Sequence, residues 1–204
     1  ASAFGDLNPT ICYSIKSCQN LHLLRLLVGL GAGMDVVSGG ELYRAMRAGA
    51  DPARIVYAGV GKTDIEINQA IDAGADILQI HGNLSDSLAK DKQFEIIAQM
   101  MDKIRSQGYV AGLGAHAVET LISCEEQGII PDYYMKTLHH DRYWSAHPLE
   151  NRVPFEVTGE CSADHNKFHD NMFCLFPEQD VTFVERSKAP VMAYKILAAG
   201  AIAP

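Results

Sequence analysis

The chain has 204 residues and a mass of 22.3 kDa, which is enough for one well-packed domain or two small ones. Hydrophobic residues make up 48% and charged residues 21%, so the disordered and fibrous classes are excluded. The 25 acidic and 17 basic side chains give a net charge of −8, and no run of Lys or Arg is present. We therefore expect no nucleic acid and no membrane partner.

The remaining composition predicts a cytoplasmic protein that acts on a small molecule. The sequence has no apolar run long enough to span a membrane and no signal peptide at its N-terminus. Its five cysteines are an odd number and form no CxxC pair, which favours reduced thiols over a disulfide framework.

Seven short apolar runs rich in β-forming residues are predicted to be strands. They are Ile11–Ser17, Met34–Ser38, Ile55–Ala58, Ile77–His81, Tyr109–His116, Asp132–Leu138 and Pro190–Leu197. Most are separated by segments with helical spacing and a capping signal. We expect helices after Asn20, after Ser38 with Glu41, after Thr63 with Glu66, from Ser85 or Asp86 to Gly108, and from Ala117 to Gln127.

Alternation of strands and helices at this spacing predicts βαβ units and a parallel sheet, hence an α/β fold. Because no Gly-rich dinucleotide fingerprint is present, a (β/α)8 TIM barrel is favoured over a doubly wound sheet. A complete barrel has eight strands and we find seven, so the barrel is predicted to be incomplete and cut at both ends. Its open edges would then associate, which predicts a homo-oligomer. The segment between Leu138 and Pro177 shows no clear helix or strand and is expected to be a functional or flexible loop.

The first predicted strand contains a lysine in an unusual place. Alternation directs Cys12, Ser14 and Lys16 toward the barrel interior, with Lys16 at the carboxyl end of the strand. A half-buried lysine is costly unless it is paired or used covalently. The spacing alone leaves two interpretations open: a structural ion pair with an acid such as Asp35, or a functional lysine.

Three sequence blocks distinguish between these interpretations. Residues Tyr13–Asn20, Gly33–Leu42 and Ile55–Thr63 resemble, in order and spacing, the diaminopimelate decarboxylases among the alanine-racemase-like (fold type III) pyridoxal-phosphate barrels. The resemblance runs from Phe4 to about Ala75. It implies a pyridoxal-phosphate-dependent amino-acid decarboxylase, a lyase of lysine biosynthesis.

The resemblance also assigns roles to individual residues. Lys16 matches the lysine that forms the Schiff base with pyridoxal phosphate, and Asp35 and Glu41 match the acidic positions that orient the lysine and the cofactor. These residue types agree with the chemistry, since a lysine amine binds the cofactor aldehyde and the pyridine ring accepts the electrons left by CO2 loss.

The later motifs of that family are not found after about Ala75. The His that stacks on the cofactor, the Gly-Gly-Gly phosphate turn and the Glu-Pro-Gly-Arg segment have no counterpart, so we expect weak or absent decarboxylation. Residues Lys136–Ser145 and Ala193–Gly200 resemble instead an uncharacterised bacterial TIM-barrel family. The chain is thus predicted to join two barrel parts, residues 1–76 and 77–204, as a designed chimera, a recombined gene or a fused gene model.

The second part places several basic side chains at strand ends, where barrel active sites lie. His81, His116, His139 and His140 could bind a divalent metal, whereas Lys136 and Lys195 could hold an anionic substrate. Each His alone is more often structural than a ligand, but their alignment favours a site. Three hypotheses stay open: the decarboxylase, a metal-dependent barrel enzyme acting on a small polar substrate, and a truncated barrel without catalysis.

Overall fold

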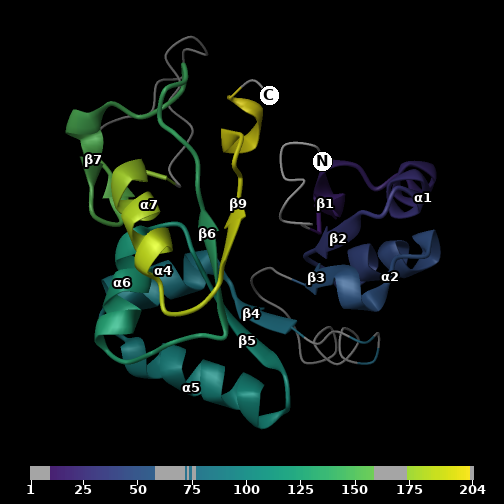
Figure 1. Cartoon of the computed structure of the whole chain (residues 1–204), viewed down its shortest axis with the longest axis horizontal. Coiled ribbons are helices and arrows are strands. Elements are labelled where there is room, and N and C mark those ends of the chain that lie inside the picture. Colours follow the sequence, from purple (N-terminus) through teal and green to yellow (C-terminus); the bar gives the residue numbers. More distant parts are fainter. Residues whose placement is uncertain (1–9, 58–71, 73, 75–76, 159–173, 203–204) are drawn as a thin grey trace. The chain divides into compact units, whose positions relative to one another are not determined.

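The computed structural model describes residues 10–57, 72, 74, 77–158 and 174–202, and it divides into two compact units, residues 1–79 and 80–204. The strand order β1-β2-β3-β4-β5-β6-β9 follows the chain, and each strand pair whose register is described in this sheet is parallel (Figure 1). The prediction of an α/β fold of the incomplete TIM-barrel type is confirmed. Strands β1 and β9 end the strand order, and association through them stays a prediction.

The first unit consists of short strands alternating with two helices. Its elements are β1 (Cys12–Ser14), a 3-10 turn (Ile15–Ser17), α1 (Leu21–Gly29), β2 (Gly33–Val36), α2 (Gly39–Ala48), a second 3-10 turn (Pro52–Arg54), β3 (Ile55–Tyr57) and the start of β4 (Ile77–Ile80). Both helices begin as the sequence predicts: Asn20 accepts a hydrogen bond from the His22 N–H, and Ser38 accepts one from the Glu41 N–H.

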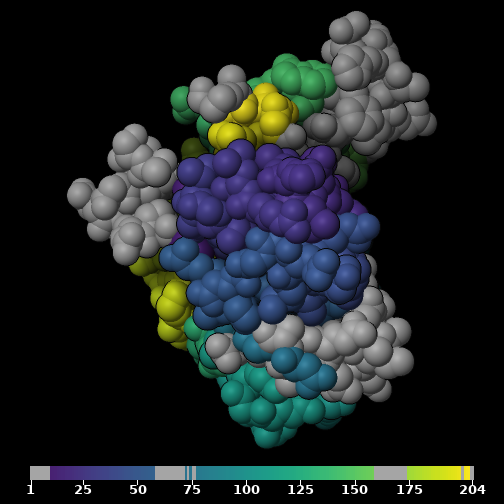
Figure 2. Space-filling view, turned by 90° about the vertical axis from the view of Figure 1, so that its right-hand side faces the viewer, coloured from purple at the N-terminus to yellow at the C-terminus, as the bar shows by residue number. Residues whose placement is uncertain are grey.

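Burial of apolar side chains fixes these helices on the strands. Ile15, Leu24, Met34 and Val36 are fully buried and form the centre of the first unit's core. On the outer face α1 and α2 lie side by side, in purple and blue in Figure 2. The parallel register sets Ser14 opposite Asp35 across β1 and β2.

The second unit contains longer helices and a larger core. Its elements are α4 (Gly82–Lys90), α5 (Phe94–Ser106), β5 (Val110–Ala115), α6 (Val118–Glu126), β6 (Tyr133–Thr137), β7 (Arg152–Val153), β8 (Glu156–Val157), α7 (Pro177–Arg186) and β9 (Val191–Tyr194), with 3-10 turns at Leu149–Asn151 and Ala198–Gly200. Fully buried Ile97, Leu113, Leu121 and Tyr134 join α5, β5, α6 and β6, and Phe183 of α7 packs on Tyr134.

Two sequence predictions about this unit are wrong. The single helix expected from Ser85 or Asp86 to Gly108 is two helices, because Lys92 adopts a left-handed conformation with φ of 58° between α4 and α5. The segment from Leu138 to Pro177 is not without structure in its described part, since β7 and β8 form an antiparallel hairpin. The helix α7 that follows was not predicted.

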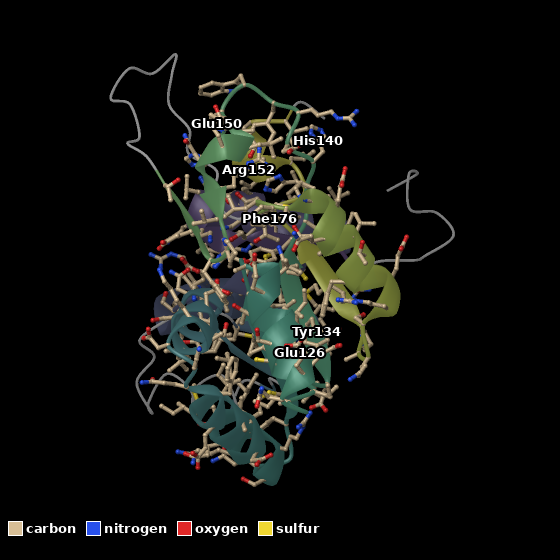
Figure 3. The ribbon with its side chains drawn as sticks, turned by 90° about the vertical axis from the view of Figure 1, so that its left-hand side faces the viewer. Glu126, Tyr134, His140, Glu150, Arg152 and Phe176 are labelled. Atoms are coloured by element: carbon tan, nitrogen blue, oxygen red, sulfur yellow. The ribbon has the colours of Figure 1, made fainter. Side chains whose placement is uncertain are left out.

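One arginine holds the described part of that segment together. Arg152 donates to the carbonyl of His147 from Nε at 2.8 Å, to Asp141 from Nη1 at 2.8 Å and to the carbonyl of Leu175 at 2.8 Å. In Figure 3 it lies close to Phe176, which precedes α7. The two residues line a cavity of about 270 Å³. The guanidinium therefore connects the hairpin to chain segments that come before and after it.

The third predicted helix, after Thr63, and most of the block Ile55–Thr63 lie outside the described residues, apart from Ile55–Tyr57 and two single positions. Within the described part of the chain, no helix combines the length and the apolar character that a bilayer span requires.

Candidate functional site

Lys16 lies just after β1 rather than on it. The strand ends at Ser14, and the 3-10 turn Ile15–Ser17 buries Ile15 completely while Lys16 is exposed. The prediction that the first strand runs from Ile11 through Lys16 to Ser17 is therefore wrong. No ion pair joins Lys16 to Asp35 among the described residues, so the structural pairing considered from the sequence is not observed.

Two observations near Lys16 fit a bound cofactor. The amine is accessible, as attack on an aldehyde requires. Ser14 Oγ is buried and makes no hydrogen bond with any described residue, although a buried hydroxyl normally has a partner. A polar ligand group beside the end of β1 would satisfy it. The residues that would hold the cofactor are Ser14, Lys16 and Asp35. Asp35 lies on β2, directly beside Ser14 of β1.

Glu41 has a local structural task that the sequence did not predict. Its side chain is only 5% exposed, although it lies in the first turn of α2. One carboxylate oxygen accepts the Val37 N–H at 2.9 Å, and the other is 3.4 Å from the Gln19 amide nitrogen. A carboxylate at this place also complements the positive end of the helix dipole. Glu41 thus shapes the turn between β2 and α2, and its role toward a cofactor stays a prediction.

In the second unit, the carboxyl ends of the strands carry the side chains that the sequence selected. His81 directly follows β4, His116 follows β5, Lys136 is the fourth residue of β6, and Lys195 follows β9. The strands β5, β6 and β9 are parallel neighbours, so His116, Lys136 and Lys195 lie toward one edge of the sheet. His81 and His116 have ring centroids 6.3 Å apart.

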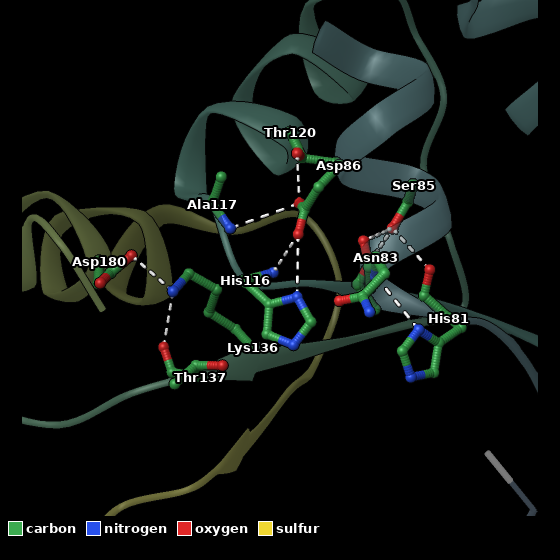
Figure 4. Close-up of polar contacts among 12 residues, drawn as sticks. His81, Asn83, Ser85, Asp86, His116, Ala117, Thr120, Lys136, Thr137 and Asp180 are labelled. Carbon is green, nitrogen blue, oxygen red and sulfur yellow. Dashed lines mark hydrogen bonds and ion pairs between the residues drawn. The ribbon is translucent and has the colours of Figure 1, made fainter. Parts of the chain in front are cut away.

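A carboxylate from α4 fixes His116 (Figure 4). Asp86 Oδ2 accepts the His116 backbone N–H at 2.9 Å and lies 3.0 Å from His116 Nδ1. Its other oxygen accepts the Thr120 hydroxyl at 2.6 Å and the Ala117 N–H at 3.4 Å. Asp86 therefore holds both the ring of His116 and the beginning of α6.

His81 is held by a different contact. Its ring Nδ1 accepts the Asn83 N–H at 3.1 Å, so His81 caps the N-terminus of α4. The next residue, Gly82, permits the close approach of the two histidines: a Cβ there would lie 2.9 Å from Cε1 of His116. Ser85, one turn farther along α4, donates its hydroxyl to the Gly114 carbonyl.

Lys136 is not available at the strand end as the sequence predicted. It is completely buried, and its ammonium forms an ion pair with Asp180 Oδ1 at 3.0 Å. The geometry of this contact is not that of a hydrogen bond. The ammonium donates to the Thr137 carbonyl at 2.6 Å. The other oxygen of Asp180 accepts from the Cys174 thiol at 2.8 Å, and burial raises the pKa of that thiol to about 12. A fully paired lysine without exposure does not suit the role of an anion receptor.

The predicted histidine metal site is not supported. His139 contacts the carbonyl of His140 through Nδ1 at 2.8 Å, and His140 Nδ1 accepts the Arg142 N–H at 3.0 Å. Across the described ranges, no group of three or more His, Cys, Asp or Glu side chains is placed to hold a metal ion. Asp141 is instead paired with Arg152, which lowers the pKa of its carboxyl.

Sequence reasoning missed the acidic partners of these basic residues. Asp86 was noted only as a helix start, and neither Asp180 nor Thr120 was selected. Asp180 had one available signal, since Pro177 followed by acidic residues is typical of a helix start, where Asp180 in fact lies. Asp86 had none, because its partner His116 is 30 residues away.

Comparison with known proteins identifies the family. A family model described as pyridoxal-dependent decarboxylase, pyridoxal binding domain, matches residues 1–105, just over half of the chain. The chain belongs to this family. The match runs well past Ala75, where the quoted motifs end, and includes α4 and most of α5.

Curated diaminopimelate decarboxylases are similar to this chain over part of its length. The diaminopimelate decarboxylase of Aquifex aeolicus is 60% identical over 71 residues, which are 35% of this chain and 16% of that protein. That of Haemophilus influenzae is 37% identical over 103 residues, 50% of this chain and 24% of that protein. The chain thus matches at most about a quarter of the length of these relatives.

Solved structures support the fold. The diaminopimelate decarboxylase from Helicobacter pylori complexed with L-lysine superposes with a TM-score of 0.54 at 18% identity, covering 94% of this chain and 58% of that one. The arginine decarboxylase of Paramecium bursaria Chlorella virus gives a TM-score of 0.50 at 12% identity, covering 94% and 59%. At such identities these likenesses show the decarboxylase barrel fold.

Proposed function

We propose that this chain binds pyridoxal phosphate through Lys16 and represents the cofactor-binding part of a diaminopimelate decarboxylase-type lyase. The observation that carries the proposal is the position of Lys16. It is an exposed amine immediately after β1, inside the family match, beside a buried Ser14 hydroxyl that lacks a partner among the described residues. The substrate class is an amino acid, as in the diaminopimelate decarboxylases to which the chain is similar.

Three residues of the first unit have different roles in this proposal. Lys16 supplies the amine that attaches the cofactor, and Asp35 places a carboxylate on the neighbouring strand. Glu41 keeps the turn after β2 in shape through its bond to the Val37 N–H. Bound pyridoxal phosphate supplies a ring that takes up the electron pair left when CO2 departs.

Turnover is proposed to be low. Decarboxylation requires the substrate carboxylate and the cofactor phosphate to be held in a defined geometry. The matching family segments end at residue 105, and the phosphate-binding turn of the family has no counterpart in the sequence that follows. We therefore expect cofactor binding with little release of CO2 from meso-diaminopimelate.

The test is covalent trapping of the cofactor. The protein is incubated with pyridoxal phosphate, reduced with borohydride, digested and analysed by mass spectrometry, with an absorption spectrum recorded before reduction. We expect the label on Lys16, and its loss together with the bound-cofactor absorption in Lys16→Ala. The matched control is Lys103→Ala, an exposed lysine on α5. Equal labelling of Lys16 and Lys103 would refute a dedicated site.

A further inference from the structure

The cavity beside Arg152 belongs to the second unit, whereas the proposed cofactor lysine, Lys16, belongs to the first. The cavity has a volume of about 270 Å³ and is lined by the 3-10 turn at Leu149, by Arg152 of β7 and by the beginning of α7. Sites for drug-sized ligands have volumes of about 300–1,000 Å³. A cavity just below this range suits a smaller organic molecule.

Arg152 holds the walls of this cavity in place (Figure 3). Its guanidinium donates to the carbonyls of His147 and Leu175 and to the carboxylate of Asp141, and only 5% of its side chain is exposed. These bonds attach β7 to the segment that precedes α7, so the walls are positioned before a ligand binds. A preformed site loses less entropy on binding than one that must first be ordered. Arg152 is therefore a structural group of the cavity and not the partner of a ligand.

Most of the remaining lining is apolar. Leu149, Leu175, Phe176 and Pro177 contribute side chains, and Leu149 is 69% exposed. A hydrocarbon chain in the cavity would remove part of this surface from water. Each CH2 group that becomes buried in this way strengthens binding about fourfold. The ligand is therefore expected to have a short aliphatic body.

Two carboxylates determine the polar end of the ligand. Asp141 bonds to Arg152 through Oδ2, and 32% of its side chain is exposed. The hydrogen bond from Arg152 lowers the pKa of Asp141, so this group stays charged. Glu178 is exposed and lies in the first turn of α7, where it offsets the positive end of the helix dipole. Because carboxylates only accept hydrogen bonds, they favour a head group that donates and is positively charged, and they repel an anion.

We propose that this cavity binds a small aliphatic primary amine, with its ammonium at the carboxylates of Asp141 and Glu178 and its hydrocarbon chain against Leu149 and Phe176. Binding is reversible and includes no covalent step. It does not rest on the proposed cofactor function, because every residue named belongs to the second unit and no pyridoxal phosphate is required.

The experiment titrates the protein, without pyridoxal phosphate, with 3-methylbutylamine and follows the backbone amides by proton–nitrogen NMR. We expect saturable shifts at Arg152, Glu178 and Gln179. The uncharged 3-methylbutan-1-ol, which has the same chain, should bind at least about fivefold more weakly, since it lacks the charge-assisted hydrogen bonds. Methylammonium should bind at least about tenfold more weakly, since it lacks the chain. The anion 4-methylpentanoate should show no saturable binding.

Two variants with matched controls locate the site. Glu178→Gln should weaken binding of the amine about two- to fivefold, the effect of one exposed ion pair. Its control is Glu185→Gln, at an exposed position near the other end of α7, which should leave binding unchanged. Leu149→Ser should weaken binding about threefold or more. Its control is Leu26→Ser, at a side chain of the first unit that is 60% exposed. The four substituted side chains are exposed, so we expect these variants to fold.

Three results would overturn the inference: no saturable binding of the amine, equal affinity for the amine and the alcohol, or equal weakening by Glu178→Gln and Glu185→Gln. Lys16→Ala should bind the amine as the wild-type protein does. Failure of the cofactor proposal would therefore leave this binding intact, and loss of amine binding in Lys16→Ala would contradict a separate site.

Discussion

The buried pair of Lys136 and Asp180 makes a quantitative prediction about stability. Neither side chain is exposed by more than 2%, and their charges are 3.0 Å apart. Lys136→Met keeps most of the aliphatic stem but removes the ammonium. Among the described residues, the Asp180 carboxylate then keeps the Cys174 thiol as its side-chain hydrogen-bond donor, and the Thr137 carbonyl loses the bond from the Lys136 ammonium. Removing one partner of such a pair costs about 3–5 kcal/mol, because an uncompensated charge stays buried.

A double variant shows whether the buried charge causes this loss. In Lys136→Met with Asp180→Asn no charge remains, and replacing both partners of a buried pair by neutral groups is often close to neutral. We expect the double variant to recover about 2 kcal/mol or more of the loss caused by Lys136→Met. The matched control is Lys90→Met, which breaks a pair with Glu156 whose side chains are about half exposed. An exposed pair contributes only about 0–1 kcal/mol.

Urea unfolding followed by tryptophan fluorescence provides the assay. The single tryptophan, Trp144, lies in the second unit, so the signal reports the unit that contains the pair. The free energy of unfolding should fall far more for Lys136→Met than for Lys90→Met, at an unchanged m-value. Equal losses for these two variants, or no recovery in the double variant, would refute the reasoning.

Two further changes test the packing and charge of the same unit. Burial is the main cause that raises the pKa of Glu119 above the ordinary 4.5, with the charges of Asp180 and Asp86 adding to it. The fold therefore favours the protonated acid, and stability is lost as pH rises from about 4.5 through the raised pKa. Glu119→Gln should stabilise the protein in urea at pH 7 and have little effect at pH 4; a gain of equal size at both values would contradict this. Gly112→Ala should cost about 1–3 kcal/mol in the same assay, because its Cβ would overlap the Tyr133 ring.

The strands of the fold could be predicted because their apolar runs are short, β-rich and separated by clear helix signals. The runs around Met34, Ile55, Tyr109 and Asp132 each contain most or all of the observed strand. Ile11–Ser17 was too long by one turn, since alternation cannot distinguish a strand from a 3-10 turn that continues it. The break between α4 and α5 at Lys92 has neither Gly nor Pro, the usual residues that mark an interruption.

Only the basic residues of the candidate site in the second unit could be predicted from the sequence. Strand ends are visible in the sequence, and they located His81, His116 and Lys195. The acids that decide what each base can do come from helices, and their contacts depend on packing. Hence Lys136, which the sequence pattern placed among the substrate-binding residues, is in fact neutralised by Asp180.

The Asp86–His116 pair bears on how the chain is divided. The family match ends at residue 105, so Asp86 lies inside it and His116 outside. Yet Asp86 makes matched bonds with His116, Ala117 and Thr120, and Ser85 beside it donates to the Gly114 carbonyl. Such mutual satisfaction of α4 with β5 and α6 arises when both sides are selected together. The contacts therefore favour one origin for α4 through α6, and the division into parts 1–76 and 77–204 stays a prediction.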